Sequence, residues 1–188
     1  MNLRRVVFKA LGLIIAFTLL FGLLETVSYA KTKGEINASV NAAMNRFKKQ
    51  VKGANEYLKV AKGVLVMPNI TKAGFIVGGQ YGQGALKVGN KTVDYYSLAA
   101  GSVGWQIGAE KYDMIIIFTT TEALNKFRSS KGWEAGADAE VTLIDIGADA
   151  PVGTLVSQHP ILGFVIDQKG LMAGVSVKGA KFTKIKPD

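Results

Sequence analysis

The chain of 188 residues contains no cysteine and a single histidine, His159. Without cysteine it can form no disulfide framework and no thiolate zinc site, so its stability must come from packing. A histidine-based catalytic triad also needs an orienting acid and a nucleophile, and a lone histidine before a proline is far more typical of a structural or exposed residue. We therefore expect no catalytic residue, no metal site, no cofactor and no enzymatic activity.

Acidic residues are also scarce, with 14 Asp and Glu against 23 Lys and Arg, which gives a net charge of +9. The one acidic cluster comprises Asp138, Glu140, Asp145 and Asp149. In a strand, Asp138 and Glu140 would share one face and Asp145 would occupy the other. Calcium binding or carboxylate-pair hydrolysis is the alternative, but no EF-hand pattern is present, so solvated loop carboxylates are the favoured interpretation.

The first thirty residues have the pattern of a cleavable secretory signal peptide. Arg4, Arg5 and Lys9 precede an apolar stretch over residues 10–24, and Ser28 and Ala30 are small residues at minus three and minus one from a cut before Lys31. As a helix the apolar stretch would rise about 22 Å, short of the ~30 Å hydrocarbon core that an uncleaved anchor would have to span. We expect cleavage between Ala30 and Lys31. The mature protein would then be periplasmic or secreted, either free or attached peripherally to a membrane.

Export disfavours nucleic acid as the partner of the positive charge. Anionic phospholipid, a membrane surface or an acidic envelope protein fits better.

Residues 31–62 show a helical period. Apolar residues recur at steps of three and four, at Ile36, Val40, Ala43, Phe47, Val51, Ala54, Leu58 and Ala61. The residue types at 32–35 predict a capping box, and Gly53 is the candidate break between two helices. Lys48, Lys52 and Lys59 would lie together about 90–140° from the apolar arc, with Lys49 beyond them. This predicts an amphipathic helix with a basic face, either merely solvated or meeting a membrane.

Residues 63–188 are rich in glycine and β-branched residues and predict short strands. Residues 64–67, 75–80, 85–88, 92–96, 102–107, 114–119, 139–146, 161–166, 171–177 and 181–185 are the expected strands. Gly89-Asn90 predicts a hairpin turn and residues 110–113 another turn. Residues 114–118 do not alternate, which indicates burial on both faces. The residue types at 119–122 predict a second capping box, followed by one short helix that contains Leu124 and Phe127.

The glycine run at residues 78–84 invites a phosphate-loop interpretation. A P-loop requires Gly-Lys-Ser/Thr opening a helix, whereas a strand-like segment follows here. Glycines in a strand favour bends or close backbone packing, so the run predicts a tightly curved sheet.

The fold class expected from these patterns is α+β. An N-terminal amphipathic helix or helix pair would pack on a compact, glycine-rich, mainly antiparallel β-sandwich or barrel with one short additional helix. The domains would be a signal peptide over 1–30 and one domain over 31–188, helical over 31–62 and β-rich over 63–188.

Several segments of the chain resemble the SYLF domain, the lipid-binding or actin-binding module of yeast actin-patch proteins and their animal relatives. The segments are AKGVLVMP at 61–68, KAGF at 72–75, the glycine run ending at Gly84, GSVGWQIGAE at 101–110, the apolar strand from Asp113 to Phe118, and KGLMAGVSV at 169–177. Two segments depart from the pattern. VDYYSL at 93–98 stands where eukaryotic members often carry Trp-Ser-Pro, and FVIDQ at 164–168 replaces a serine-rich Tyr-Ser-x-Ser. Actin binding does not transfer to an exported protein.

The resemblance implies a non-enzymatic lipid-binding module that uses its N-terminal amphipathic region. The basic positions that match this role are Lys48, Lys49, Lys52, Lys59 and Lys62. The alternative left open is a structural or protein-interaction module of the envelope whose charge serves solubility.

Overall fold

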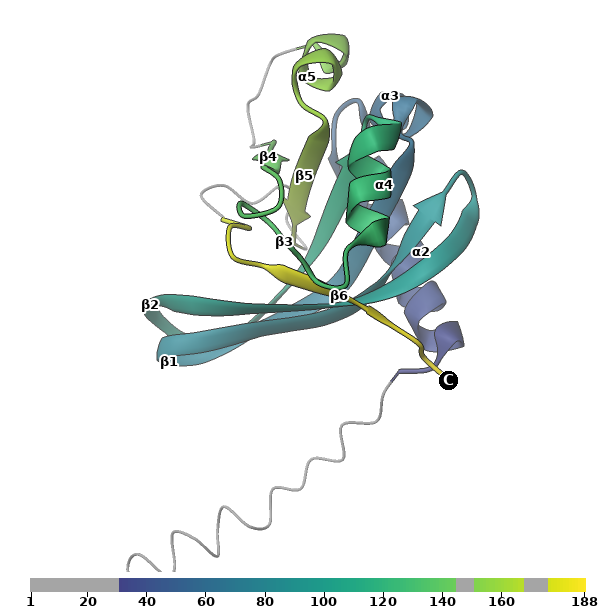
Figure 1. Ribbon diagram of the computed structural model, residues 1–188. Coiled ribbons are helices and arrows are strands. Elements are labelled where there is room, and N and C mark those ends of the chain that lie inside the picture. Colours follow the sequence, from purple (N-terminus) through teal and green to yellow (C-terminus); the bar gives the residue numbers. More distant parts are fainter. Residues whose placement is uncertain (1–30, 145–150, 168–175) are drawn as a thin grey trace, which may run out of the picture. The chain divides into compact units, whose positions relative to one another are not determined.

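Two long antiparallel strands, β1 (Gly63–Val88) and β2 (Lys91–Phe118), form the frame of the fold in the computed structural model (Figure 1). The structure describes residues 31–144, 151–167 and 176–188, without the side chains of 74–77 and 102–109. The strands pair from Gly63 opposite Phe118 to Val88 opposite Lys91, around a two-residue turn at Gly89-Asn90. Gly89 has a φ of 60°, the left-handed conformation that glycine tolerates, so the predicted hairpin turn is confirmed.

The remaining described strands join β2 and its neighbours in one mixed sheet. β5 (Ile161–Ile166) pairs with the end of β2, and β6 (Lys181–Ile185) pairs with Tyr95–Ala99 of β2. The short strands β3 (Trp133–Glu134) and β4 (Thr142–Leu143) extend it, and β4 runs parallel to β5 while the other pairs are antiparallel. The sheet order is β3-β6-β2-β5-β4, with β1 on β2, which confirms the predicted α+β, mainly antiparallel class.

The sheet curls so tightly that two halves of β1 meet. A Cβ atom on Gly84 would stand 2.0 Å from the carbonyl oxygen of Val66 and 2.9 Å from the Cα of Met67, and one on Gly82 would stand 2.8 Å from a side-chain atom of Ile70. Only a residue without a side chain fits where backbone approaches backbone so closely. The glycine run therefore shapes the sheet, as the sequence predicts.

Helices α2 (Lys33–Gln50) and α3 (Ala54–Val60) cover one face of the sheet. The Thr32 and Glu35 capping box is present, and Gly53 separates the helices with a φ of 78°. Most of the predicted apolar face packs into a helix-side core with the sheet. In α3, however, Tyr57 is buried against Phe164, with ring centroids 5.0 Å apart, whereas Leu58 and Ala61 are half-buried.

The opposite face of the sheet carries a second core beneath α4 (Thr121–Ser129), whose Leu124 and Phe127 are buried there. Met114, Ile116 and Phe118 point into this core, while Ile115 and Ile117 point into the helix-side core. Residues 114–118 are thus buried on both faces, which explains why their sequence does not alternate.

Several local predictions were wrong. Residues 110–113 continue β2 instead of turning. The segments 64–67, 75–80 and 85–88 are strand residues as expected, but they form one continuous strand, β1, instead of three short ones. The second capping box is absent, because α4 begins after Thr120, whose hydroxyl accepts a hydrogen bond from the amide of Ala123. Helix α5 (Val152–Gln158) was not expected. The strand expected over 139–146 is reduced to β4 within the described residues, and most of 171–177 lies outside them.

Candidate functional site

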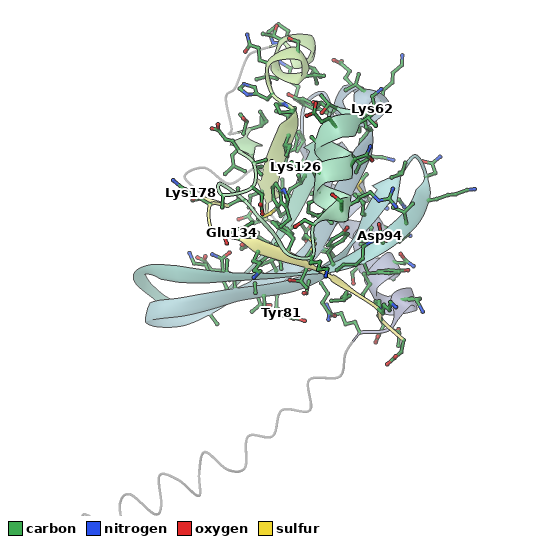
Figure 2. The ribbon with its side chains drawn as sticks, viewed as in Figure 1. Lys62, Tyr81, Asp94, Lys126, Glu134 and Lys178 are labelled. Carbon is green, nitrogen blue, oxygen red and sulfur yellow. The ribbon has the colours of Figure 1, made fainter. Side chains whose placement is uncertain are left out.

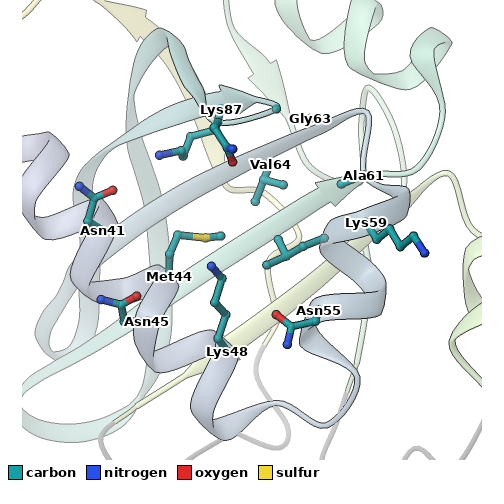
Figure 3. Close-up of a pocket in the computed structure, with 13 residues that line it drawn as sticks. Asn41, Met44, Asn45, Lys48, Asn55, Lys59, Ala61, Gly63, Val64 and Lys87 are labelled. Carbon is teal, nitrogen blue, oxygen red and sulfur yellow. The ribbon is translucent and has the colours of Figure 1, made fainter.

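A groove of about 580 Å³ lies between the two N-terminal helices and the hairpin end of β1 (Figure 3). Apolar side chains line it at Met44, Leu58, Ala61 and Val64. Asparagine amides surround this apolar part, at Asn41, Asn45, Asn55 and Asn90. Three lysines, Lys48, Lys59 and Lys87, also line the groove, and none of the described residues that line it is acidic. The groove therefore combines positive charge, hydrogen-bonding groups and apolar surface.

Helix α2 presents two different faces because of its period. Ile36, Val40, Ala43 and Phe47 are fully buried against the sheet. Asn41, Met44, Asn45 and Lys48 follow the spacing i, i+3, i+4 and i+7, which places them on a second face that borders the groove. The same helix thus docks with one stripe and lines the groove with the next.

The five lysines predicted as lipid-binding are all exposed, but the structure brings only some of them to the groove. Lys48 and Lys59 line it, whereas Lys49, Lys52 and Lys62 do not. Figure 3 shows Lys48 extending from α2 toward the strands and the ammonium of Lys87 reaching over the groove toward Asn41, while Lys59 directs its ammonium outward.

Lys87 was missed by sequence reasoning. It lies near the end of β1, two residues before Gly89-Asn90, and it enters the site only because the hairpin packs beside α2. The turn signal placed it on a hairpin, but nothing local to residue 87 indicates which helix that hairpin approaches.

An ion pair fixes the position of α2 on the sheet. The Nε and Nη2 atoms of Arg46 lie 2.7 and 2.6 Å from one carboxylate oxygen of Asp113, and the amide of Asn69 donates to the other at 2.9 Å. Asp113 is 4% exposed. At the other end of α2, Asn37 donates to the hydroxyl of Tyr95 at 2.9 Å and accepts from that of Thr92 at 3.0 Å. These contacts therefore fasten α2 to the sheet at two separate places along its length.

Two of the other candidate residues, His159 and Asp138, make structural contacts. His159 ends α5, its Nδ1 lies 3.0 Å from the hydroxyl of Thr142, and its carbonyl accepts from Thr119. Asp138 accepts a hydrogen bond from the amide of Glu134 at 2.7 Å, and Asp145 and Asp149 lie outside the described residues. Among the residues that the structure describes, no group of His, Asp and Glu could hold a metal ion.

Two tyrosines away from the groove have altered acidity. Burial, and then the charge of Glu110, raises the pKa of Tyr112 to about 12, and its hydroxyl donates to the Oε1 of Gln80. Burial, and then the charge of Asp94, raises the pKa of Tyr96 to about 12. Both hydroxyls are therefore neutral at physiological pH and unsuited to act as bases.

In the described ranges, the helices are too short or too polar to cross a bilayer.

Figure 2 shows Lys62 near the start of β1, and Lys178 beside Glu134 in a different part of the unit. This separation provides lysines near to and far from the groove for comparison.

Comparison with known proteins gives concordant matches. The family model described as "Las17-binding protein actin regulator" matches residues 99–187. LAS seventeen-binding protein 3 of Saccharomyces cerevisiae is 29% identical over 143 residues, covering 70% of this chain and 31% of that protein. Protein YSC84 of the same yeast is 28% identical over 143 residues, covering 70% of this chain and 30% of that protein.

A third relative is an SH3 domain-containing protein of Schizosaccharomyces pombe, 29% identical over 145 residues, covering 70% of this chain and 33% of that protein. The chain thus spans about a third of the length of the curated relatives it matches. The family and the first of these relatives are named for binding and not for catalysis. The family model, the yeast relatives and the α+β fold agree in supporting the resemblance of this chain to the SYLF domain family.

Proposed function

We propose that this protein is a non-enzymatic module that binds anionic phospholipid through the basic surface of its N-terminal helices. The observation that carries the proposal is the groove, which Lys48, Lys59 and Lys87 line with no acidic residue among the described lining. Long lysine side chains can lie along a helix border and present their ammonium groups to phosphates. Each lysine near an anionic surface contributes about 1 kcal/mol of attraction.

The burial of α2 specifies how such a surface would meet a membrane. Four apolar residues of α2 are fully buried and Arg46 is paired with Asp113, so inserting the apolar stripe into lipid would require undocking the helix. That step would expose the helix-side core to solvent and leave a buried carboxylate without its partner, both of which are costly. The helix therefore binds in its docked state, with its exposed basic face toward the phosphates.

The proposed location is the cell envelope, in the periplasm or outside the cell, after removal of residues 1–30. Its support is the charged, apolar and small-residue pattern that precedes Lys31. The matching family is described as an actin regulator, but an exported chain would not meet actin, so we do not propose actin as a partner.

The second candidate is a protein-interaction module of the envelope without direct lipid binding. A yeast relative is named for binding LAS seventeen, which favours a protein partner as the alternative. An acidic envelope protein would suit the same basic surface.

Vesicle flotation separates the two candidates. We expect Lys48→Gln, Lys52→Gln and Lys59→Gln together to weaken binding to anionic vesicles by about 2–3 kcal/mol at low salt. Glutamine keeps helix propensity, so the fold should survive. The control is Lys178→Gln, Lys181→Gln and Lys186→Gln, three exposed lysines elsewhere. Lys184 is unsuitable because its ammonium lies 2.8 Å from Asp94 in an ion pair. Equal binding by wild type and the helix variant would contradict the proposed surface.

A further inference from the structure

We infer that the groove is a discrete site for one phosphate-bearing headgroup that carries hydroxyls and no ammonium group. This inference rests on the proposed function and goes beyond it. A basic surface alone predicts binding that follows only the charge density of the membrane, whereas a built site predicts saturable binding that depends on the identity of the headgroup.

The first step is the arrangement of the two inward-reaching cations. Lys48 comes from α2 and Lys87 comes from β1, and Figure 3 shows them entering the groove from its two sides. A solvated helix face would not need a lysine from the sheet. Two flexible lysine side chains from different elements thus offer ammonium donors for the oxygens of a bound phosphate.

The second step concerns what surrounds the cations. Asn41 and Asn45 on α2 and Asn55 on α3 provide side-chain amides. An amide both donates and accepts hydrogen bonds, which matches the hydroxyls of a glycerol-like or sugar-like alcohol. Because no carboxylate is present among the described lining, an ammonium group of a headgroup would meet lysines instead of a partner charge.

The third step is size and polarity. The volume of about 580 Å³ falls within the range of roughly 300–1,000 Å³ typical of small-molecule sites. Met44, Leu58 and Val64 supply an apolar part of the lining. That part suits the glycerol carbons next to the phosphate of a lipid, so both portions of one amphiphile are accommodated.

Matched lysine variants test the site. Lys49 directly follows Lys48, and Lys91 lies four residues after Lys87 across the hairpin turn. Both are exposed and do not line the groove. We expect Lys48→Gln with Lys87→Gln to weaken binding to phosphatidylglycerol vesicles by about tenfold or more. Lys49→Gln with Lys91→Gln removes the same charge and should weaken it several-fold less. Circular dichroism and urea unfolding confirm that both variants fold.

The outcomes of these experiments distinguish the discrete site from the proposed lipid-binding function. Equal losses of vesicle binding in both double variants, or no loss in either, would overturn the discrete site. The proposed lipid-binding function would still stand if the wild-type protein binds anionic vesicles. A wild-type protein that binds no anionic vesicle would overturn the proposed function itself, and the site with it.

Headgroup and competition experiments identify the ligand chemistry. At equal molar fraction, vesicles of phosphatidylserine should bind several-fold more weakly than vesicles of phosphatidylglycerol, although both lipids carry one net negative charge. Soluble glycerol 3-phosphate should compete with phosphatidylglycerol vesicles at concentrations where inorganic phosphate does not. Equal competition by both anions would overturn the role of the hydroxyls and point to a free-phosphate site. Equal binding of both vesicles would overturn the exclusion of ammonium groups.

Discussion

The hydroxyl of Tyr96 lies in the core under α4, where its ring packs 4.7 Å from that of Phe127. Tyr96 is 1% exposed, and its hydroxyl has no hydrogen-bond partner among the described residues. A buried hydroxyl without a partner costs free energy that an apolar group of the same shape would not.

Replacing Tyr96 with phenylalanine should therefore leave the free energy of unfolding unchanged at neutral pH or raise it by up to about 1 kcal/mol. The variant should also resist alkali better. Because the folded-state pKa of Tyr96 is raised from 10.0 to about 12, the unfolded state ionises first, and wild-type stability falls as pH rises from 10 toward 12. Urea unfolding between neutral pH and pH 11 measures both effects. Destabilisation at neutral pH, or an unchanged alkaline slope, would show that the hydroxyl is satisfied or solvated.

Arg46 and Asp113 provide the second residue-scale prediction. Arg46→Met should lower the free energy of unfolding by about 2–4 kcal/mol, because among the described residues the buried carboxylate then retains the hydrogen bond from Asn69 alone. Adding Asp113→Asn should recover part of the loss, since the buried charge disappears with its partner. A double-mutant cycle in urea measures this coupling, and a coupling near zero would mean that the pair does not hold α2.

At the scale of the element, the length and curl of β1 depend on close backbone packing. Gly84→Ala places a methyl group into the carbonyl of Val66, so we expect a loss of more than about 3 kcal/mol or failure to fold. Gly101 offers the matched control, because a Cβ there meets nothing within 4 Å. Thermal unfolding of both variants decides the matter. Equal melting temperatures would contradict the observed approach of the two halves of β1.

The same elements show how far local sequence signals reach. Helix α2 was predictable because its cap and its apolar period are local, and residues 114–118 were predictable because burial on both faces removes alternation. The supposed turn at 110–113 looked polar enough to be exposed. Asp113 is instead buried, because Arg46, 67 residues earlier, neutralises it. Lys87 escaped notice for a similar reason, since its place beside α2 depends on how distant elements dock.

At the scale of the whole molecule, the first prediction concerns processing. In a host that exports the chain, we expect the recovered protein to begin at Lys31, because Ser28 and Ala30 provide the small residues that signal peptidase requires. Intact-mass measurement reads the N-terminus directly. Recovery of residues 1–30 on the exported protein would favour an uncleaved anchor and overturn the proposed location after cleavage.

Binding of residues 31–188 to vesicles as a function of salt tests the central claim most directly. The protein should float with anionic vesicles at low salt and progressively less as salt rises, because the Debye length falls from ~30 Å at 0.01 M to ~8 Å at 0.15 M. Neutral vesicles of the same size should bind weakly throughout, since they offer the lysines no counter-charge. Failure to float with anionic vesicles even at the lowest salt, or equal flotation with neutral ones, would contradict the account.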